Sequence, residues 1–358
     1  MKILFCNISY MIHYEGQTSR DITPTGAGKW VKENQDAHEK WNFLNYDGYC
    51  YGFVQNKGQF CIEHFEDVEY NENATDGVTI IWCAPLGKEK TVIVGWYENA
   101  KMYREYQYSI CTPVTGIDRA YFSKAKAEDC YLLPEELRTF EIGRASVLGI
   151  GKGFGQQNYW YADSEYAKTE LIPKVLSFIS SHKKDRINRL SDFFAESEAA
   201  NIKLSDKEKK EMDIYYDNGE YDKYLSLGYK KFKATGSADD AFYIAAALKE
   251  LYQFSQAIKW YEKVVEIEGE SWDTYGNMVY LYEQINQHEK AIEIAKCLLK
   301  YPQSKQDNVK EELYGIIADN EHYLGNDEEA IKWLDKILDT TTNKVLIEHT
   351  KKIKKSWS

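Results

Sequence analysis

The chain has 358 residues, which is more than one compact core of about 100–200 residues normally holds, so we expect two domains. Its composition is that of a folded soluble protein, and the formal net charge of -12 argues against a protein that coats nucleic acid or anionic membrane by bulk electrostatics. The seven cysteines form no CxxC pair, and no apolar run approaches the roughly 18 residues of a spanning helix. These features predict reduced core thiols in a cytoplasmic protein that does not enter a membrane.

Short strands dominate the first part of the chain, residues 1–170. Runs such as KILFCNI, VTIIWCAP and KTVIVGWY are rich in β-branched and aromatic residues, and turn sequences such as NKGQ and TDGV separate them. Helical periodicity occurs in TPTGAGKWVKENQDAHEKWNF and FSKAKAEDCYLLPEELRTF. The pattern predicts an α+β domain with a mostly antiparallel sheet, for which partial closure into a barrel-like form is one option.

Residues 171–204 are polar, charged and prone to form helix. We interpret them as a helical linker between the first domain and a second domain at 205–358.

The second domain contains an internal repeat. Three segments share an Ala-Ile step at Ala257, Ala291 and Ala330, with spacings of 34 and 39 residues. A degenerate earlier copy, NGEYDKYLSLGYKKF, places Tyr224 33 residues before Ala257. The period and the small residue resemble the tetratricopeptide repeat, a pair of antiparallel helices of about 34 residues. The resemblance implies an all-α stack whose concave groove binds a protein or peptide, and most of the tyrosines and tryptophans here are interpreted as packing between helices.

Three clusters in the first domain contain more aromatic and amide side chains than a core requires. They are KWVKENQDAHEKWNF, GWYENA and the glycine-rich GIGKGFGQQNYWYAD. A flat nucleobase held outside a helix needs aromatic faces for stacking and amides that read its edge. The alternatives are that Trp96 simply caps the core and that the glycine run is a plain connection. The predicted ligand-binding residues are Trp30, Trp96, Tyr97, Asn99, Lys152, Gln156, Asn158 and Trp160.

The sequence contains none of the catalytic, cofactor-binding or metal-binding motifs for which we searched. GIGKGFG lacks the GxxxxGK[ST] pattern of a phosphate-binding loop, and HEKWN at His38 lacks the second histidine of a zinc site. Cys83, with a distant His64 as base, is better explained as a buried structural cysteine. We therefore predict no cofactor and no metal. A nucleic-acid- or nucleotide-processing enzyme that uses His38, Glu39 and Asp163 is the rival hypothesis.

The first domain also has a resemblance of its own. TGAGKWVKENQDAHEKWNF with DGYCYGFV, then VIVGWYENAKMYR and GFGQQNYWYAD, is loosely similar to the PUA-like modules of bacterial restriction and defence proteins. That group includes the EVE and YTH domains, and the resemblance implies an aromatic cage for a modified base. Because this half of the chain is acidic, it implies a focused pocket and not broad nucleic-acid affinity.

The preferred hypothesis is a two-domain adaptor. Its first domain would bind a base, a nucleotide or modified DNA or RNA, and its repeats would bind a protein partner. A pure protein-protein interaction scaffold is the third alternative, and the sequence leaves the choice between DNA and RNA open.

Overall fold

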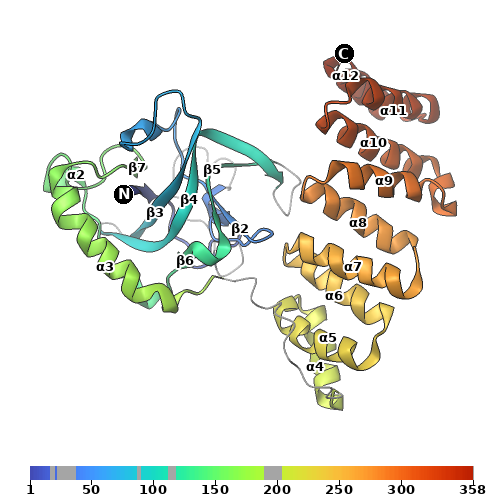
Figure 1. The fold of residues 1–358 in the computed structure, drawn as a ribbon, viewed down its shortest axis with the longest axis horizontal. Helices are drawn as coiled ribbons and strands as arrows, with labels where there is room; N and C mark the ends of the chain where they lie inside the picture. The colour runs from blue at the N-terminus through green and yellow to red at the C-terminus, as the bar shows by residue number, and fades with distance from the viewer. Residues whose placement is uncertain (17–20, 22–37, 87–89, 112–117, 189–203, 358) are drawn as a thin grey trace. The chain divides into compact units, whose positions relative to one another are not determined.

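The computed structural model describes residues 1–16, 21, 38–86, 90–111, 118–188 and 204–357 (Figure 1). The chain divides into two compact units, Met1–Asp192 and Phe193–Ser358, which are described separately below as the sheet unit and the helical unit. In the described part of the chain, no helix has the length and apolar character needed to cross a bilayer.

The sheet unit is built on one seven-stranded sheet with the order β2-β5-β4-β3-β1-β7, and β6 pairs with β4 beside this path. The β1–β3 pair is parallel and the other pairs are antiparallel, as the sequence predicts for most of the sheet. Among the described strands the path does not return to its first strand, so the barrel-like option is not supported. The strands are β1 Lys2–Asn7, β2 Tyr49–Gly52, β3 Ala74–Leu86, β4 Lys90–Cys111, β5 Asp118–Lys126, β6 Cys130–Leu132 and β7 Tyr159–Trp160.

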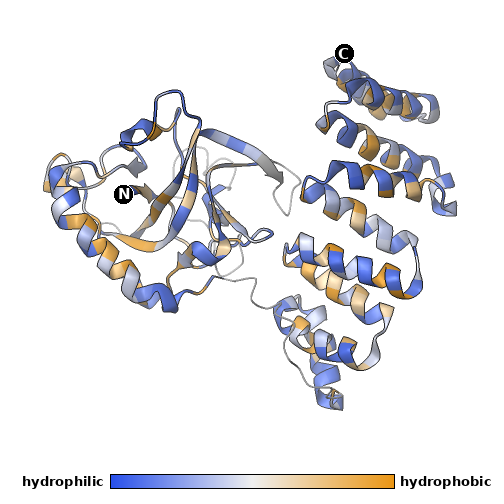
Figure 2. Ribbon diagram, viewed as in Figure 1, coloured by the Kyte–Doolittle hydropathy of each residue, from blue (hydrophilic) through white to orange (hydrophobic). Residues whose placement is uncertain are grey.

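Both faces of this sheet are buried, which explains why its central strands are apolar throughout. In β1, Leu4 and Cys6 face one core, while Ile3 and Phe5 face the other. The second core is covered by α3 (Ile172–His182), as Figure 1 shows, and Val175 is one of its buried residues. Apolar residues are accordingly concentrated along the central strands and on α3 (Figure 2).

Short helical segments join the strands. They are the 3₁₀ turns η1 His38–Trp41, η2 Ile62–His64, η3 Ala127–Asp129, η4 Glu135–Leu137 and η6 Lys183–Asp185, the helix α2 Ala145–Leu148, and the π-helical turn η5 Ala167–Leu171. The segment expected to link the domains thus begins with α3, whose buried face packs on the sheet. Residues 189–203 of this segment lie outside the described part of the chain.

The helical unit is an array of antiparallel helix pairs. The pairs are α4/α5, α6/α7, α8/α9 and α10/α11, followed by α12, and consecutive helices pack on each other. The bounds are α4 Asp206–Asp217, α5 Tyr221–Thr235, α6 Ala238–Glu250, α7 Phe254–Glu268, α8 Trp272–Gln284, α9 His288–Leu298, η8 Pro302–Lys305, α10 Asp307–Tyr323, α11 Asp327–Thr340 and α12 Lys344–Trp357. These repeats resemble tetratricopeptide repeats in period and pairing.

The same turn joins the two helices in every pair. Gly219, Tyr252, Asn286 and Gly325 occupy this turn, and each has a left-handed φ between 56° and 79°. One residue further on, the backbone N–H donates to a carbonyl five residues earlier, at 2.8–2.9 Å, which is the closing bond of a Schellman motif. The degenerate first pair has this geometry too, so it is a genuine unit of the array.

Small side chains sit where the paired helices cross. Ala257, Ala291 and Ala330 are fully buried, and Tyr224 takes the equivalent position in the first pair. A methyl group at this position lets the backbones approach closely, while a larger side chain forces them apart.

We predict that Ala291→Leu destabilises the helical unit by about 1–3 kcal/mol, because three added carbon atoms overpack a closed crossing. Urea unfolding of the full chain, followed by the helical circular dichroism signal, measures this. The matched control is Ala234→Leu at an exposed position of α5, which should change stability by less than about 0.5 kcal/mol. Equal effects of the two changes would contradict the crossing argument.

Candidate functional site

The two aromatic residues predicted at the rim of a base pocket lie on opposite faces of β4. Trp96 is fully buried in the core under α3, stacks on Tyr131 with ring centroids 5.0 Å apart, and donates its Nε1–H to Glu98 at 3.3 Å. Tyr97 is fully buried in the other core, and its hydroxyl donates to the backbone carbonyl of Asn42. Trp96 and Tyr97 therefore do not line one pocket.

Adjacent residues of a strand point to opposite faces of the sheet, which explains this placement, and a bulge just before them determines which face each residue takes. Trp82 pairs with Gly95 but Cys83 pairs with Ile93, so Val94 is an extra residue that shifts the alternation of side chains. The strand then continues to Cys111, and the aromatic pair stays inside the fold and does not reach a rim.

Asn99 marks a second irregularity of the same strand. Its φ of 51° lies in the left-handed region, and the pairing of β3 with β4 shifts here, between Val78 and Ile80. Asparagine tolerates this backbone conformation better than most residues, so a bulge accounts for the residue type.

The residues predicted near β7 serve mainly to attach that strand. Trp160 packs on Phe5 with ring centroids 5.4 Å apart. The backbone carbonyl of Asn158 accepts from the Asn7 N–H at 2.7 Å, and the Asn158 side chain donates to the Gln55 carbonyl at 3.3 Å. Trp160 and Trp96 thus belong to the same core, on the α3 side of the sheet.

The remaining predicted residues do not complete a pocket in the described structure. Gln156 is exposed, and the Lys152 ammonium lies 5.5 Å from the ring of Tyr166. Trp30 lies outside the described residues, so its predicted role stays a prediction.

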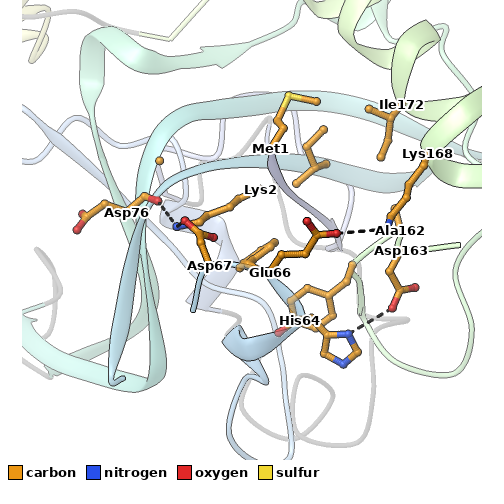
Figure 3. Close-up of a pocket in the computed structure, with 14 residues that line it drawn as sticks. Met1, Lys2, His64, Glu66, Asp67, Asp76, Ala162, Asp163, Lys168 and Ile172 are labelled. Carbon is orange, nitrogen blue, oxygen red and sulfur yellow. Dashed lines mark hydrogen bonds and ion pairs between the residues drawn. The ribbon is translucent and has the colours of Figure 1, made fainter. Parts of the chain in front are cut away.

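A polar pocket of about 780 Å³ lies elsewhere on the sheet unit, between the start of β1, the η2 turn and the segment that follows β7 (Figure 3). Charged side chains of both signs line it. Three ion pairs join them: Lys2–Asp67 at 2.9 Å, His64–Asp163 at 3.3 Å and Lys168–Glu66 at 3.9 Å. These ion pairs engage six of the seven charged side chains of the lining, so few are left for a charged ligand.

The structure separates the side chains of the enzymatic alternative. Asp163 pairs with His64, whose ring stacks on Tyr161 at 4.5 Å, whereas Glu39 accepts a hydrogen bond from the Ser9 hydroxyl at 2.9 Å. Burial raises the pKa of the Cys83 thiol, which opposes its use as a nucleophile. Among the residues that the structure describes, no group of three histidine, cysteine or acidic side chains is placed to hold a metal ion.

A second candidate surface follows the first helix of successive pairs in the helical unit. We call it the first-helix face and define it as the solvent-exposed side of α6, α8 and α10. Tyr243, Tyr280 and Tyr323 stand on it, one from each helix, and are 50%, 44% and 71% exposed. The sequence pattern alone does not distinguish these three tyrosines from the residues that pack between helices.

Hydrogen bonds join the three helices across this face. Lys249 of α6 donates to the Asn277 side chain of α8 at 2.9 Å, and Asn320 of α10 donates to the Glu283 carboxylate of α8 at 2.7 Å. The first helices are therefore neighbours.

The electrostatics of this face are unusual around Glu283. Its pKa is raised to about 7, mainly because the surrounding protein desolvates it; the hydrogen bond from Asn320 lowers the pKa and the charge of Asp319 raises it. The pKa of Asp319 is also raised by desolvation, although this residue is exposed.

A smaller hollow of about 340 Å³ lies between α7, α8 and α9. Its polar groups are already engaged, since the Tyr282 hydroxyl donates to Glu262 at 3.1 Å and the Lys290 ammonium lies 5.1 Å from the Tyr282 ring. Of the two surfaces, the first-helix face offers more exposed aromatic area.

We predict that Trp96→Ala lowers the stability of the sheet unit by about 3–5 kcal/mol, because it removes a fully buried indole. Thermal unfolding of the full chain, followed by near-ultraviolet circular dichroism, measures the loss. Tyr108→Ala at an exposed position of the same strand is the control and should have little effect. A Trp96→Ala protein as stable as the wild type would show that the indole is not a core residue.

We predict that Glu283→Gln stabilises the helical unit above about pH 7 and flattens its dependence on pH. The folded-state pKa of about 7 exceeds the ordinary 4.5, so the folded state holds a proton that the unfolded state has lost. Stability contributed by this group is therefore present in acid and is lost as pH rises from 4.5 to 7. At about pH 8 the variant should gain about 2–4 °C in Tm.

Thermal unfolding across this pH range provides the test, with Asp273→Asn on the exposed side of α8 as the control. If Glu283→Gln retained the full wild-type slope between 4.5 and 7, the assignment to Glu283 would be wrong.

The comparisons with known proteins concern the helical repeats. No protein-family model and no curated protein matches the chain. Solved structures that are similar include MamA protein, at 14% identity over 42% of this chain and 84% of that chain, with a TM-score of 0.35. YrrB, described as a TPR protein with an unusual peptide-binding site, is 16% identical over 52% of this chain and 87% of its own, with a TM-score of 0.34. MamA from Desulfovibrio magneticus RS-1 is 13% identical over 43% and 91%, with a TM-score of 0.35. At these scores, the identification of repeats rests on the period and the shared turns described above.

Proposed function

We propose that the helical unit is a docking scaffold that holds a segment of a partner protein on its first-helix face. The observation that carries this proposal is the presence of one exposed tyrosine on each of three adjacent first helices, Tyr243, Tyr280 and Tyr323. Tyrosine offers a large rigid surface with a polar end, and for this reason it is enriched at protein interfaces.

The construction of the array supports the same role. Each pair buries its small crossing residue and its apolar side against neighbouring helices. The rings of Tyr243, Tyr280 and Tyr323 contact Tyr216, Phe254 and His288 and still keep a large exposed part. An array of this kind presents an extended surface made of rigid elements, which suits the binding of a peptide segment.

Charge favours a protein over a nucleic acid on this face. Helix α10 carries five carboxylates and one lysine, and α8 carries Asp273 and Glu283 with no lysine or arginine. A phosphate backbone would be repelled by such a surface.

For the sheet unit, recognition of a base stays a prediction from the sequence. Trp96 and Tyr97 are engaged in separate cores, and Trp30 lies outside the described residues. An adaptor in which the sheet unit binds a second ligand is consistent with the proposal, but the proposal itself rests on the helical unit alone.

We predict that selection of random peptides of about twelve residues on the immobilised full chain yields binders that depend on the exposed tyrosines. The combined change Tyr280→Ala and Tyr323→Ala should weaken their binding about tenfold or more, because truncating interface tyrosines removes most of their contact area. Fluorescence anisotropy with a labelled copy of a selected peptide measures the affinity.

The matched control is Tyr70→Ala with Tyr108→Ala, which removes two exposed tyrosines from the sheet unit. It should leave the affinity unchanged. Selection of no binder, or of binders that tolerate the loss of Tyr280 and Tyr323, would overturn the proposed function.

A further inference from the structure

Charge is unevenly divided between the two kinds of helix in the array. The first helices are acidic: α6 has three carboxylates and one lysine, and α10 has five carboxylates and one lysine. The second helices are less acidic in sum: α5 has four lysines and one aspartate, α7 has three carboxylates and two lysines, and α9 has two residues of each sign, although α11 has five carboxylates and two lysines. The side that carries the exposed tyrosines is therefore also the side where negative charge collects.

Several carboxylates on this side have no cation beside them in the described structure. Asp273, Glu283 and Asp319 make no ion pair with a lysine or arginine there, although Asp319 lies near His322 and near His349 of α12. Lys249 is the lysine of this face, and it is engaged with Asn277 at 2.9 Å and Glu250 at 3.8 Å. Second-helix carboxylates behave differently, as Glu329 pairs with Lys332 at 2.8 Å.

The carboxylates are also held where water solvates them poorly. Surrounding protein raises the pKa of both Glu283 and Asp319, and the two lie close enough for the charge of one to act on the other. A cation placed between them would restore the solvation that their surroundings deny them.

Resting on the proposed function, we propose that the segment held on the first-helix face is rich in lysine or arginine. Its cations would lie against Tyr280 and Tyr323 and pair with Glu283 and Asp319. The charge of the face and its exposed rings are complementary to this one class of segment, and an acidic or phosphorylated segment would be repelled.

The tyrosines add a second attraction for such a segment. A lysine or arginine within about 6 Å of an aromatic ring is attracted by the electron density of its face. The helical unit already uses this contact inside its own fold, since Lys336 lies 3.1 Å from the Trp333 ring centre and Lys223 lies 5.4 Å from Tyr215. Tyr280 and Tyr323 can do the same for a partner's cations.

The test uses the full chain and three labelled peptides of equal length, alternating alanine with lysine, glutamine or glutamate. Anisotropy is measured at about 0.15 M salt, where charges more than about 8 Å apart in solution are largely screened. We expect the lysine peptide to bind and the other two not to bind. Glu283→Gln with Asp319→Asn should weaken the lysine peptide about 5- to 10-fold.

The control variant removes the same charge from a second helix, as Glu328→Gln with Asp339→Asn on exposed positions of α11. It should change the affinity less than about twofold, because the remaining effect is only that of net charge. Equal losses in the two variants would show bulk attraction to an acidic protein and overturn the proposal. Thermal unfolding of each variant establishes that it is folded.

Two further outcomes separate this inference from the proposed function. If the selected peptides depend on Tyr280 and Tyr323 but are neutral or acidic, the docking face stands and the basic partner is wrong. Light scattering could instead show a dimer that is dissociated by Glu283→Gln with Asp319→Asn. The occupant of the face would then be a second copy of this chain, whose lysine-rich α12 supplies the cations. That result would overturn the proposal of a separate partner.

Discussion

The close crossing of paired helices at Ala257, Ala291 and Ala330 is the constraint on which the helical unit depends. Because each crossing residue is only a methyl group, the two helices of a pair lie close together and the next pair packs against them. The left-handed turn that joins the helices repeats at the same place in every pair, and its closing hydrogen bond fixes the angle at which the second helix returns. The shared turn and, in the three later pairs, the small crossing residue bring the first helices side by side.

This construction explains why the outward side of the first helices is available for binding. Apolar residues are used for contacts between helices, and the outward positions are free to carry other chemistry. They carry tyrosines and carboxylates, and the protein around Glu283 raises the pKa of its carboxyl to about 7. Exposed rings together with poorly solvated negative charge form a surface that an added cationic segment would stabilise. The fold thus creates the surface to which the proposed partner is complementary.

The sequence predicted the structure well where a pattern repeats, and less well where backbone irregularities determine which way side chains point. The 34-residue period located the helix pairs, including the degenerate copy at Tyr224, because every pair must solve the same packing problem. The exposed tyrosines could have been found by placing each one within its repeat, since Tyr280 falls on the opposite side of α8 from the buried Met278 and Val279. In the sheet unit, the alternation of side chains along a strand already places the neighbours Trp96 and Tyr97 on opposite faces, whereas the bulge at Val94 and the left-handed Asn99 are backbone events without a clear sequence signal. The His64–Asp163 pair joins residues far apart in the chain, so no local sequence motif predicts it.

The central claim is that the first-helix face binds a protein segment. Hydrogen–deuterium exchange of the full chain, with and without the lysine–alanine peptide, tests it most directly because it reports where the peptide lies. The account predicts slower exchange in α8 and α10, around Tyr280 and Tyr323, and unchanged exchange in α7 and α9. Protection confined to the sheet unit, or spread evenly over every acidic helix, would contradict the account.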